Sequence, residues 1–166
     1  MAELTLKERL QPSLLDRLID DDPAASQESR DQRVLSIQRL RESVLRDLAW
    51  LLNCESLDNL EDLDGVPQVR TSVLTYGIPA LSGNTLSGTN LGRLERRIVE
   101  AVRNFEPRIL PESLAVRATA SDSEMSKKSL SLEIEGELWA QPVPQRLFLR
   151  TEVDLDTGMV TIKERH

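Results

Sequence analysis

The spacing of apolar residues changes along this chain, and that change limits the folds that it can adopt. Over residues 30–53 and 91–105 apolar side chains recur every three or four positions, which is typical of an amphipathic helix. Over residues 114–119, 130–138 and 147–153 they alternate with polar residues, which is typical of a strand with one buried face. Helices followed by an antiparallel meander predict an α+β fold with two layers, in which two or three helices pack on the sheet.

Short signals near the ends of these elements refine the prediction. Asn90 is a candidate N-cap for the second helix. Pro107 ends that helix, because the residue before a proline avoids the helical conformation. Gly136 predicts a β-bulge in the strand that contains it. Residues 156–158 (Asp-Thr-Gly) predict a hairpin turn before a short last strand.

The pattern divides the chain into an N-terminal segment, residues 1–30, and a single domain, residues 31–166. Leu14, Leu15 and Leu18 fall near helical spacing and give the N-terminal segment a short apolar face. The small, polar residues that follow this face are typical of a linker. Two interpretations stay open: the face packs on its own domain, or the segment is a docking peptide for another subunit.

The charge balance and hydropathy of the chain exclude several kinds of partner. The 28 acidic residues outnumber the 21 Lys and Arg residues, so the net charge of −7 disfavours nucleic acid or an anionic membrane as a partner. The longest apolar run, residues 48–52, is too short to span a bilayer, so we expect no direct membrane insertion. The first ten residues lack the basic and then apolar regions of a secretory signal, so we expect a cytoplasmic protein.

The chain also lacks the residues that most catalytic and metal sites require. Its one cysteine is Cys54 and its one histidine is the terminal His166, so it cannot build an internal disulfide or a cysteine-based or multi-histidine metal site. An ordered Ser-His-Asp triad is excluded for the same reason. We therefore expect no catalytic residue, no metal and no cofactor.

The densest short motif is Glu106-Pro107-Arg108, at the junction between the second helix and the first strand. Proline holds Glu106 in an extended conformation, so the Glu106 and Arg108 side chains project to the same side as an opposite-charge pair. One interpretation is a local salt bridge that caps the preceding helix, which contributes about 0–1 kcal/mol when it is exposed. The other is a pair that bonds polar groups of a partner protein.

Glu106 is also the best-placed carboxylate for a glycosidase, which is the alternative to a structural role. Such an enzyme needs two carboxylates, one of which has a raised pKa. Arg108 would lower the pKa of Glu106, which is the wrong direction for a general acid. Two Trp, one Tyr and two Phe leave few rings to stack on sugars. We expect Trp50 to lie in the core, and Trp139 on an open face.

Five sequence segments, taken together and in order, resemble one protein family. They are SLLDRLIDDDP, RLRESVLRDLAWLLN, SVLTYGIP, FEPRI, and ELWAQPVPQRLFLRTEVD followed by DTG. The chain resembles the TssE subunit of type VI secretion systems, which is related to the small baseplate wedge protein of contractile-tailed phages. This resemblance implies a structural subunit that joins the wedge proteins TssF and TssG in a cytoplasmic baseplate assembled at the inner membrane.

The resemblance also implies roles for particular residues. Glu106, Pro107 and Arg108 match the hallmark triplet of the family, which implies that they anchor the subunit to the wedge core. The family is similar in shape to the interlocking domain of the sheath, which implies that it templates the first ring of the sheath proteins TssB and TssC. Members of the family have often been labelled lysozyme-like, so the alternative function is a peptidoglycan-cleaving, lysozyme-like enzyme.

The last predicted strand is the candidate for this template. Val160 and Ile162 are expected to face the core, while Met159, Thr161 and Lys163 face outward. Unpaired main-chain groups at such an edge can bond an incoming sheath strand, and the N–H of Thr161 is the first group to test. The other interpretation is an ordinary edge that Lys163 and its charged neighbours protect.

Overall fold

The computed structural model describes residues 13–19, 37–57, 63, 65–81, 88–121, 129–139, 144–155 and 157–164. Its longer elements, in chain order, are the helices α1 (Leu14–Leu18), α2 (Ile37–Leu52) and α3 (Gly88–Phe105), then the strands β1 (Ala115–Ser121), β2 (Ser129–Leu138), β3 (Gln145–Asp154) and β4 (Val160–Glu164). The predicted α+β fold of helices on an antiparallel sheet is therefore confirmed. Two short 3₁₀ helices, η2 (Val69–Thr71) and η3 (Val73–Thr75), lie between α2 and α3.

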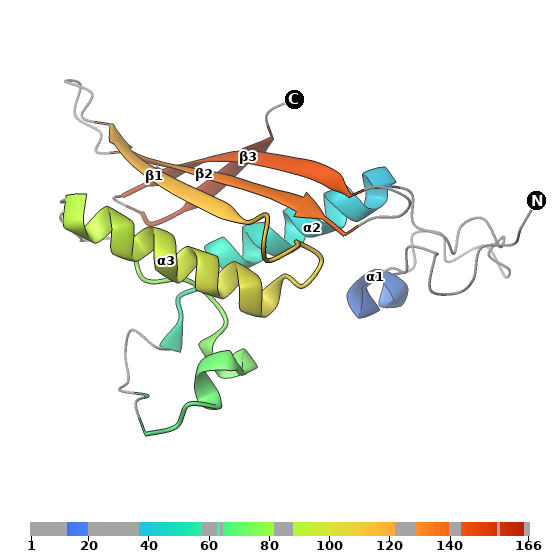
Figure 1. The fold of residues 1–166 in the computed structure, drawn as a ribbon, viewed down its shortest axis with the longest axis horizontal. Helices are drawn as coiled ribbons and strands as arrows, with labels where there is room; N and C mark the ends of the chain where they lie inside the picture. The colour runs from blue at the N-terminus through green and yellow to red at the C-terminus, as the bar shows by residue number, and fades with distance from the viewer. Residues whose placement is uncertain are drawn as a thin grey trace, which may run out of the picture.

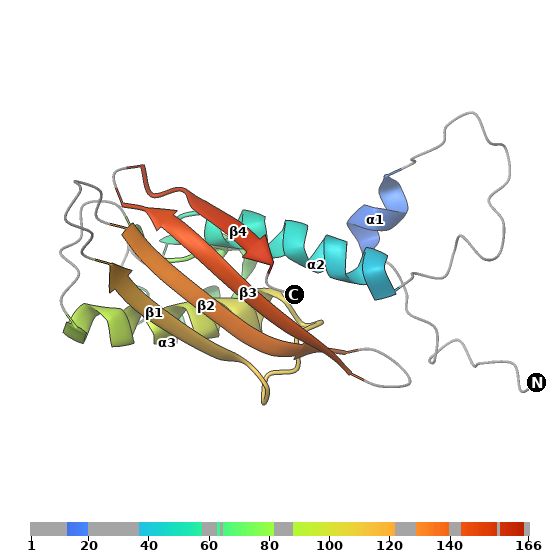
Figure 2. The same ribbon diagram turned by 90° about the horizontal axis from the view of Figure 1, so that it is seen from above.

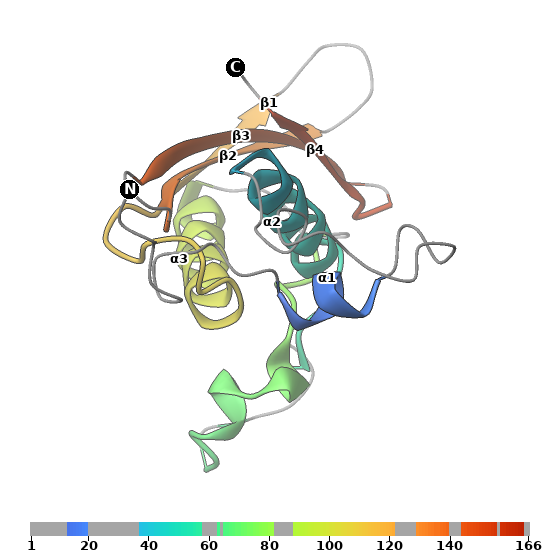
Figure 3. The ribbon, with the colours of Figure 1, turned by 90° about the vertical axis from the view of Figure 1, so that its right-hand side faces the viewer.

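The sheet is a meander in which each strand pairs with the next. The strand order is β1-β2-β3-β4, and every pairing is antiparallel. Helices α2 and α3 lie side by side under one face of the curved sheet, and the other face carries no described helix (Figures 1 and 3). Seen from above, α3 runs along the β1 side and α2 along the β4 side (Figure 2). Both outer strands therefore have a helix near their free edge.

One continuous apolar core fills the space between the two layers. The alternation in β3 buries every second residue from Leu147 to Val153, and the residues between them, Phe148, Arg150 and Glu152, lie on the other face of the sheet. The apolar stripe of α2 packs against the same layer, with Val44 and Leu48 fully buried. Ile98 and Val102 on α3 are also fully buried. The two spacings seen in the sequence thus correspond to the two layers of the fold.

Two predictions about local structure are wrong. Gly136 pairs directly with Leu147 in an unbroken ladder, so it marks no bulge. Its lack of a side chain instead makes room for Ile109, because a Cβ at Gly136 would lie 2.9 Å from the Ile109 Cγ2 atom. Asn90 is not an N-cap either, because α3 begins two residues earlier, at Gly88.

The two tryptophans both lie on the surface. Trp50 is 50% exposed, and the guanidinium carbon of Arg46 lies 5.2 Å from the centre of its ring, so the prediction of a core position is wrong. The ring follows Leu48 by two positions on α2, which turns it away from the buried stripe. Trp139 is 46% exposed, as expected for an open face.

Residues 65–76 extend away from the two layers and return to α3 (Figure 3). The Thr75 hydroxyl lies 3.0–3.3 Å from the carbonyl oxygens of Val69, Arg70 and Ser72 and can donate its one hydrogen to any of them, so it ties η3 to η2. At the base of this segment the Ile78 amide donates to the Cys54 carbonyl at 2.9 Å, and the Ser56 amide donates to the Ile78 carbonyl at 3.0 Å. Among the described residues, no helix has the length and apolar character that a membrane crossing requires.

Candidate partner-binding site

The Glu106-Pro107-Arg108 motif forms a tight turn that is fixed at both ends. The Glu106 amide still donates to the Val102 carbonyl at 2.8 Å, which continues the bonding of α3 by one residue. Beyond Pro107, the Arg108 carbonyl accepts from the Trp139 amide at 2.7 Å. The turn is therefore held between the last residues of α3 and the end of β2.

Glu106 and Arg108 form a two-point ion pair across this turn. The Arg108 Nε donates to Glu106 Oε1 at 2.6 Å and the Arg108 Nη2 donates to Glu106 Oε2 at 2.5 Å. The Arg108 amide adds a third bond to the same carboxylate, at 3.2 Å. Glu106 is only 2% exposed, so its carboxylate is buried within its own chain. The two side chains pair as predicted. Because the pair is not exposed, the contribution of about 0–1 kcal/mol that an exposed salt bridge makes to stability does not apply to it.

Arg108 also connects the turn to α2. Its Nη1 donates to the Ser43 hydroxyl at 2.9 Å, and its Nη2 donates to Asp47 Oδ2 at 2.5 Å. Burial alone would lower the pKa of Arg108, but the hydrogen bonds and negative charges of Glu106 and Asp47 outweigh it and raise that pKa. The guanidinium therefore carries its full charge and joins α3 to α2.

The ion pairs continue from α2 to α1. Asp47 Oδ1 accepts from the Arg46 Nε at 2.9 Å, and Arg46 Nη1 lies 2.7 Å from Asp16 Oδ1. Burial alone would raise the pKa of Asp16, but hydrogen bonds from Ser13 and the charge of Arg46 lower it below its usual value. We call the five residues Glu106, Arg108, Asp47, Arg46 and Asp16 the ion-pair chain. It runs from the 106–108 turn to α1.

The leucines of α1 do not pack into the core. Leu14 is 72% exposed, Leu18 is 73% exposed and Leu15 is 38% exposed. Helix α1 therefore contacts α2 through the ion pair between Asp16 and Arg46. Its apolar side chains stay exposed and available to a partner protein.

Of the residues of the predicted template edge, Thr161 and Lys163 lie on β4, and Met159 immediately precedes that strand. Met159 and Thr161 are exposed and Val160 is buried, while Lys163 belongs to β4 and its side chain is outside the described part. The Asp154 amide donates to the Met159 carbonyl at 3.0 Å. Because bonded pairs alternate along an antiparallel ladder, the pair of Thr161 and Glu152 is bonded too. The Thr161 N–H therefore points at β3, and it is not the group that this edge offers to another strand.

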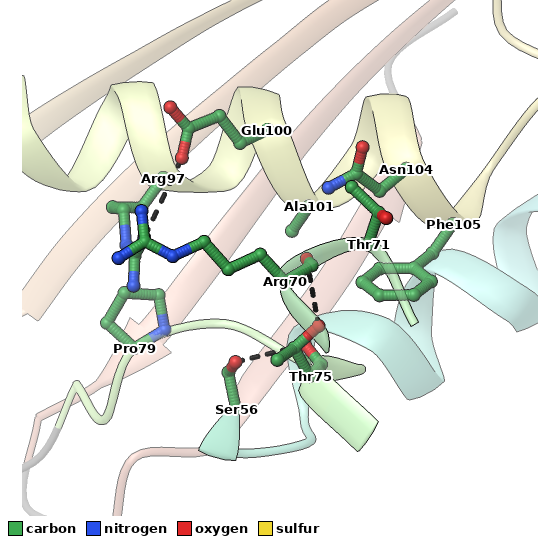
Figure 4. Close-up of a pocket in the computed structure, with 11 residues that line it drawn as sticks. Ser56, Arg70, Thr71, Thr75, Pro79, Arg97, Glu100, Ala101, Asn104 and Phe105 are labelled. Atoms are coloured by element: carbon green, nitrogen blue, oxygen red, sulfur yellow. Dashed lines mark hydrogen bonds and ion pairs between the residues drawn. The ribbon is translucent and has the colours of Figure 1, made fainter. Parts of the chain in front are cut away.

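A pocket of about 240 Å³ lies between α3 and the 3₁₀ segment (Figure 4). Arg70 enters it from the 3₁₀ segment, and Arg97 and Glu100 enter it from α3. Among the described residues, its only lining carboxylate is Glu100, which lies 3.7 Å from Arg97, so the described part of this pocket holds no pair of carboxylates such as a glycosidase needs. In the part of the chain that the structure describes, no group of three or more metal-ligating side chains comes together.

Sequence reasoning missed Ser43 and Asp47, which complete the bonding of Arg108. They lie four residues apart on one face of α2, and Ser43 is a buried polar residue beside the apolar stripe. In the sequence, only the position of Ser43 beside the apolar stripe points to this contact. The partner of both residues, Arg108, is more than 60 residues away along the chain.

Comparison with known proteins gives one match. The sequence model of the family described as baseplate wedge protein gp25 matches residues 38–143, which include α2 from its second residue onward, α3, the 106–108 turn, β1 and β2. No curated protein and no solved structure matches the chain.

Proposed function

Since the chain belongs to the baseplate wedge protein gp25 family, we propose that it is the wedge subunit of a type VI secretion system. Members of this family are structural parts of contractile tail-like machines, so the expectation that the protein is not an enzyme is confirmed. The lysozyme-like alternative is wrong for the same reason. The assignment to a secretion system, and to a cytoplasmic baseplate at the inner membrane, depends on the five sequence segments that resemble TssE.

The observation that carries the proposal is the 106–108 turn, which lies inside the matched region. In the proposed wedge this turn contacts TssF and TssG. The Glu106 carboxylate is occupied by Arg108, so the groups left for a partner are the exposed ring of Pro107 and the outer side of the Arg108 guanidinium, whose side chain is 20% exposed. The ion pair holds the turn in one shape before the partner arrives, which reduces the entropy that binding must overcome.

A second contact with the wedge proteins is proposed for the N-terminal segment, through Leu14, Leu15 and Leu18. Three exposed leucines on one short helix are a typical anchor for an apolar groove of a partner. The ion pair between Asp16 and Arg46 holds this helix on α2. The sheath proteins TssB and TssC are proposed to meet the domain at β4.

Deleting residues 1–22 is expected to leave the domain folded and to weaken its capture by TssF and TssG. The described core residues all lie beyond this segment, so the Tm should change by no more than a few degrees. Co-purification from cells that express all three proteins measures the capture. A narrower variant replaces only Leu14 and Leu18 by serine, and it should also weaken capture while it keeps the Asp16 ion pair.

Two outcomes contradict this assignment. A large loss of Tm in the deletion variant would show that the segment belongs to the core of its own domain. Failure of the intact, folded protein to purify with TssF and TssG would contradict the proposed wedge itself.

A further inference from the structure

Trp50 is a large apolar side chain on the surface of α2, and its ring is braced there. It is 50% exposed. A tryptophan side chain buries about 150–250 Å² when it is covered, so half exposure leaves on the order of 100 Å² for a partner. The guanidinium of Arg46, one helical turn earlier, lies over the ring. Arg46 bonds Asp47 at 2.9 Å and Asp16 at 2.7 Å, so the cation that braces the ring is itself fixed.

Trp50 lies close to both of the contacts that are proposed for the wedge proteins. Arg46, which is stacked on its ring, forms the ion pair that holds α1. Asp47 bonds Arg46 on one side and Arg108 of the 106–108 turn on the other. Helix α1 lies beside α2 on the side away from the sheet (Figure 3). The leucines of α1, the ring of Trp50 and the turn are therefore neighbouring parts of one surface.

The charged groups of this surface are paired with each other. Arg46 is paired with Asp16 and Asp47, and Arg108 is paired with Asp47 and Glu106. Charges that are paired within the chain give a charged partner little to attract it. The centre of a protein interface is depleted of charged residues and enriched in tryptophan and arginine. The surface therefore fits an apolar partner, such as one face of an amphipathic helix, better than an acidic or basic segment.

The only other tryptophan of the chain, Trp139, is exposed to nearly the same extent, at 46%, but it lies in a different place. Its neighbour Leu138 is fully buried, so the alternation of β2 puts the Trp139 ring on the open face of the sheet. On that face the cross-strand pair of Glu137 and Arg146 precedes it. Trp139 therefore serves as the matched control for Trp50.

We propose that Trp50 is the central anchor of the surface that joins this chain to the wedge. An apolar helix face of the TssF–TssG complex covers the Trp50 ring together with the leucines of α1 and the 106–108 turn, and Arg46 positions the ring for this contact. The inference rests on the proposed wedge function. It adds to that function a further partner-binding residue and the chemistry of the partner surface.

Hydroxyl-radical footprinting, read by mass spectrometry, tests the contact on the unaltered full chain. In the isolated protein the two tryptophans should be oxidised at similar rates, because they are similarly exposed. In the purified complex with TssF and TssG, Trp50 should be oxidised at least about fivefold more slowly, since interface anchors are fully desolvated, and Trp139 should keep its rate. Protection of Trp50 that grows with the concentration of the isolated protein would show that a second copy covers it, which overturns the proposal.

Substitution of Trp50 tests whether the contact stabilises the complex. Trp50→Ala should raise the Kd for the purified TssF–TssG complex at least about tenfold, as measured by biolayer interferometry. Trp50→Phe keeps an apolar ring and should raise the Kd less, while Trp139→Ala should leave it within about twofold. Trp50 lies outside the buried stripe of α2, so the variants should stay folded, which circular dichroism checks.

Two results separate this inference from the function on which it rests. If TssF and TssG bind the intact protein while Trp50 stays reactive and Trp50→Ala binds as tightly as the parent, the anchor assignment is wrong and the wedge function survives. If the intact, folded protein does not bind TssF and TssG, the wedge function fails, and the anchor assignment fails with it.

Discussion

Replacing Arg108 by methionine should lower the free energy of unfolding by about 3–5 kcal/mol, because it leaves a buried carboxylate without its partner. Glu106 is 2% exposed and accepts three bonds from Arg108, while Asp47 and Ser43 accept one each. At about 2–4 °C per kcal/mol for a chain of this size, the Tm should fall by roughly 6–20 °C. Thermal unfolding followed by circular dichroism measures it.

Two further variants show that the loss comes from the unpaired charge. The double variant Glu106→Gln with Arg108→Met removes both charges and should recover part of the stability that Arg108→Met loses. Arg103→Met removes an exposed arginine of α3 that bonds only the Pro111 carbonyl, so it should change stability by less than about 1 kcal/mol. If Arg108→Met has the same Tm as the parent protein, the 106–108 turn does not act as the junction between α3 and α2.

Gly77→Ala should destabilise the protein by about 2–4 kcal/mol, because this position combines backbone strain with a backbone clash. The φ angle of Gly77 is 128°, a backbone conformation that L-residues with a side chain rarely adopt. A Cβ there would lie 2.5 Å from the Cys54 carbonyl oxygen. That oxygen accepts from the Ile78 amide, so it cannot move away without breaking the bond that closes the 3₁₀ segment.

Gly92→Ala is the matched control for this change. Gly92 lies within α3, and a Cβ added there meets nothing within 4 Å. Alanine favours a helix over glycine, so this variant should gain about 0.5–1 kcal/mol. Urea unfolding of both variants gives the two values. Equal stability of Gly77→Ala and the parent protein would contradict the described path of the chain at residues 76–78.

The sequence was sufficient to predict the layers of the fold but not the contacts that connect them. Alternation and helical spacing are local patterns, so they predicted the strands and the buried faces of α2 and α3. Trp50 lies just outside the apolar stripe of α2, where helical spacing does not show whether a side chain is buried. The prediction of a core position therefore depended only on the apolar character of tryptophan, and it was wrong. Gly136 was misread because the sequence does not reveal that Ile109 approaches it from another part of the chain.

The same reason explains what could be predicted of the candidate site. Glu106 and Arg108 are two residues apart, so their pairing followed from the extended backbone before a proline. The bond from Asn53 to Val160 spans 107 residues, and the bond from Arg108 to Ser43 spans 65. A bond between residues that are far apart along the chain leaves no periodic signal, so the structure was needed to find these two bonds and the burial of Glu106.

Assembly of sheath tubes in living cells tests the central claim most directly. The measurement counts fluorescent tubes of tagged TssB in the source organism after the gene for this protein is removed. We expect no tubes in these cells, and we expect expression of the intact protein to restore them. Tubes in normal number without the protein would contradict its assignment as the wedge subunit on which the sheath assembles.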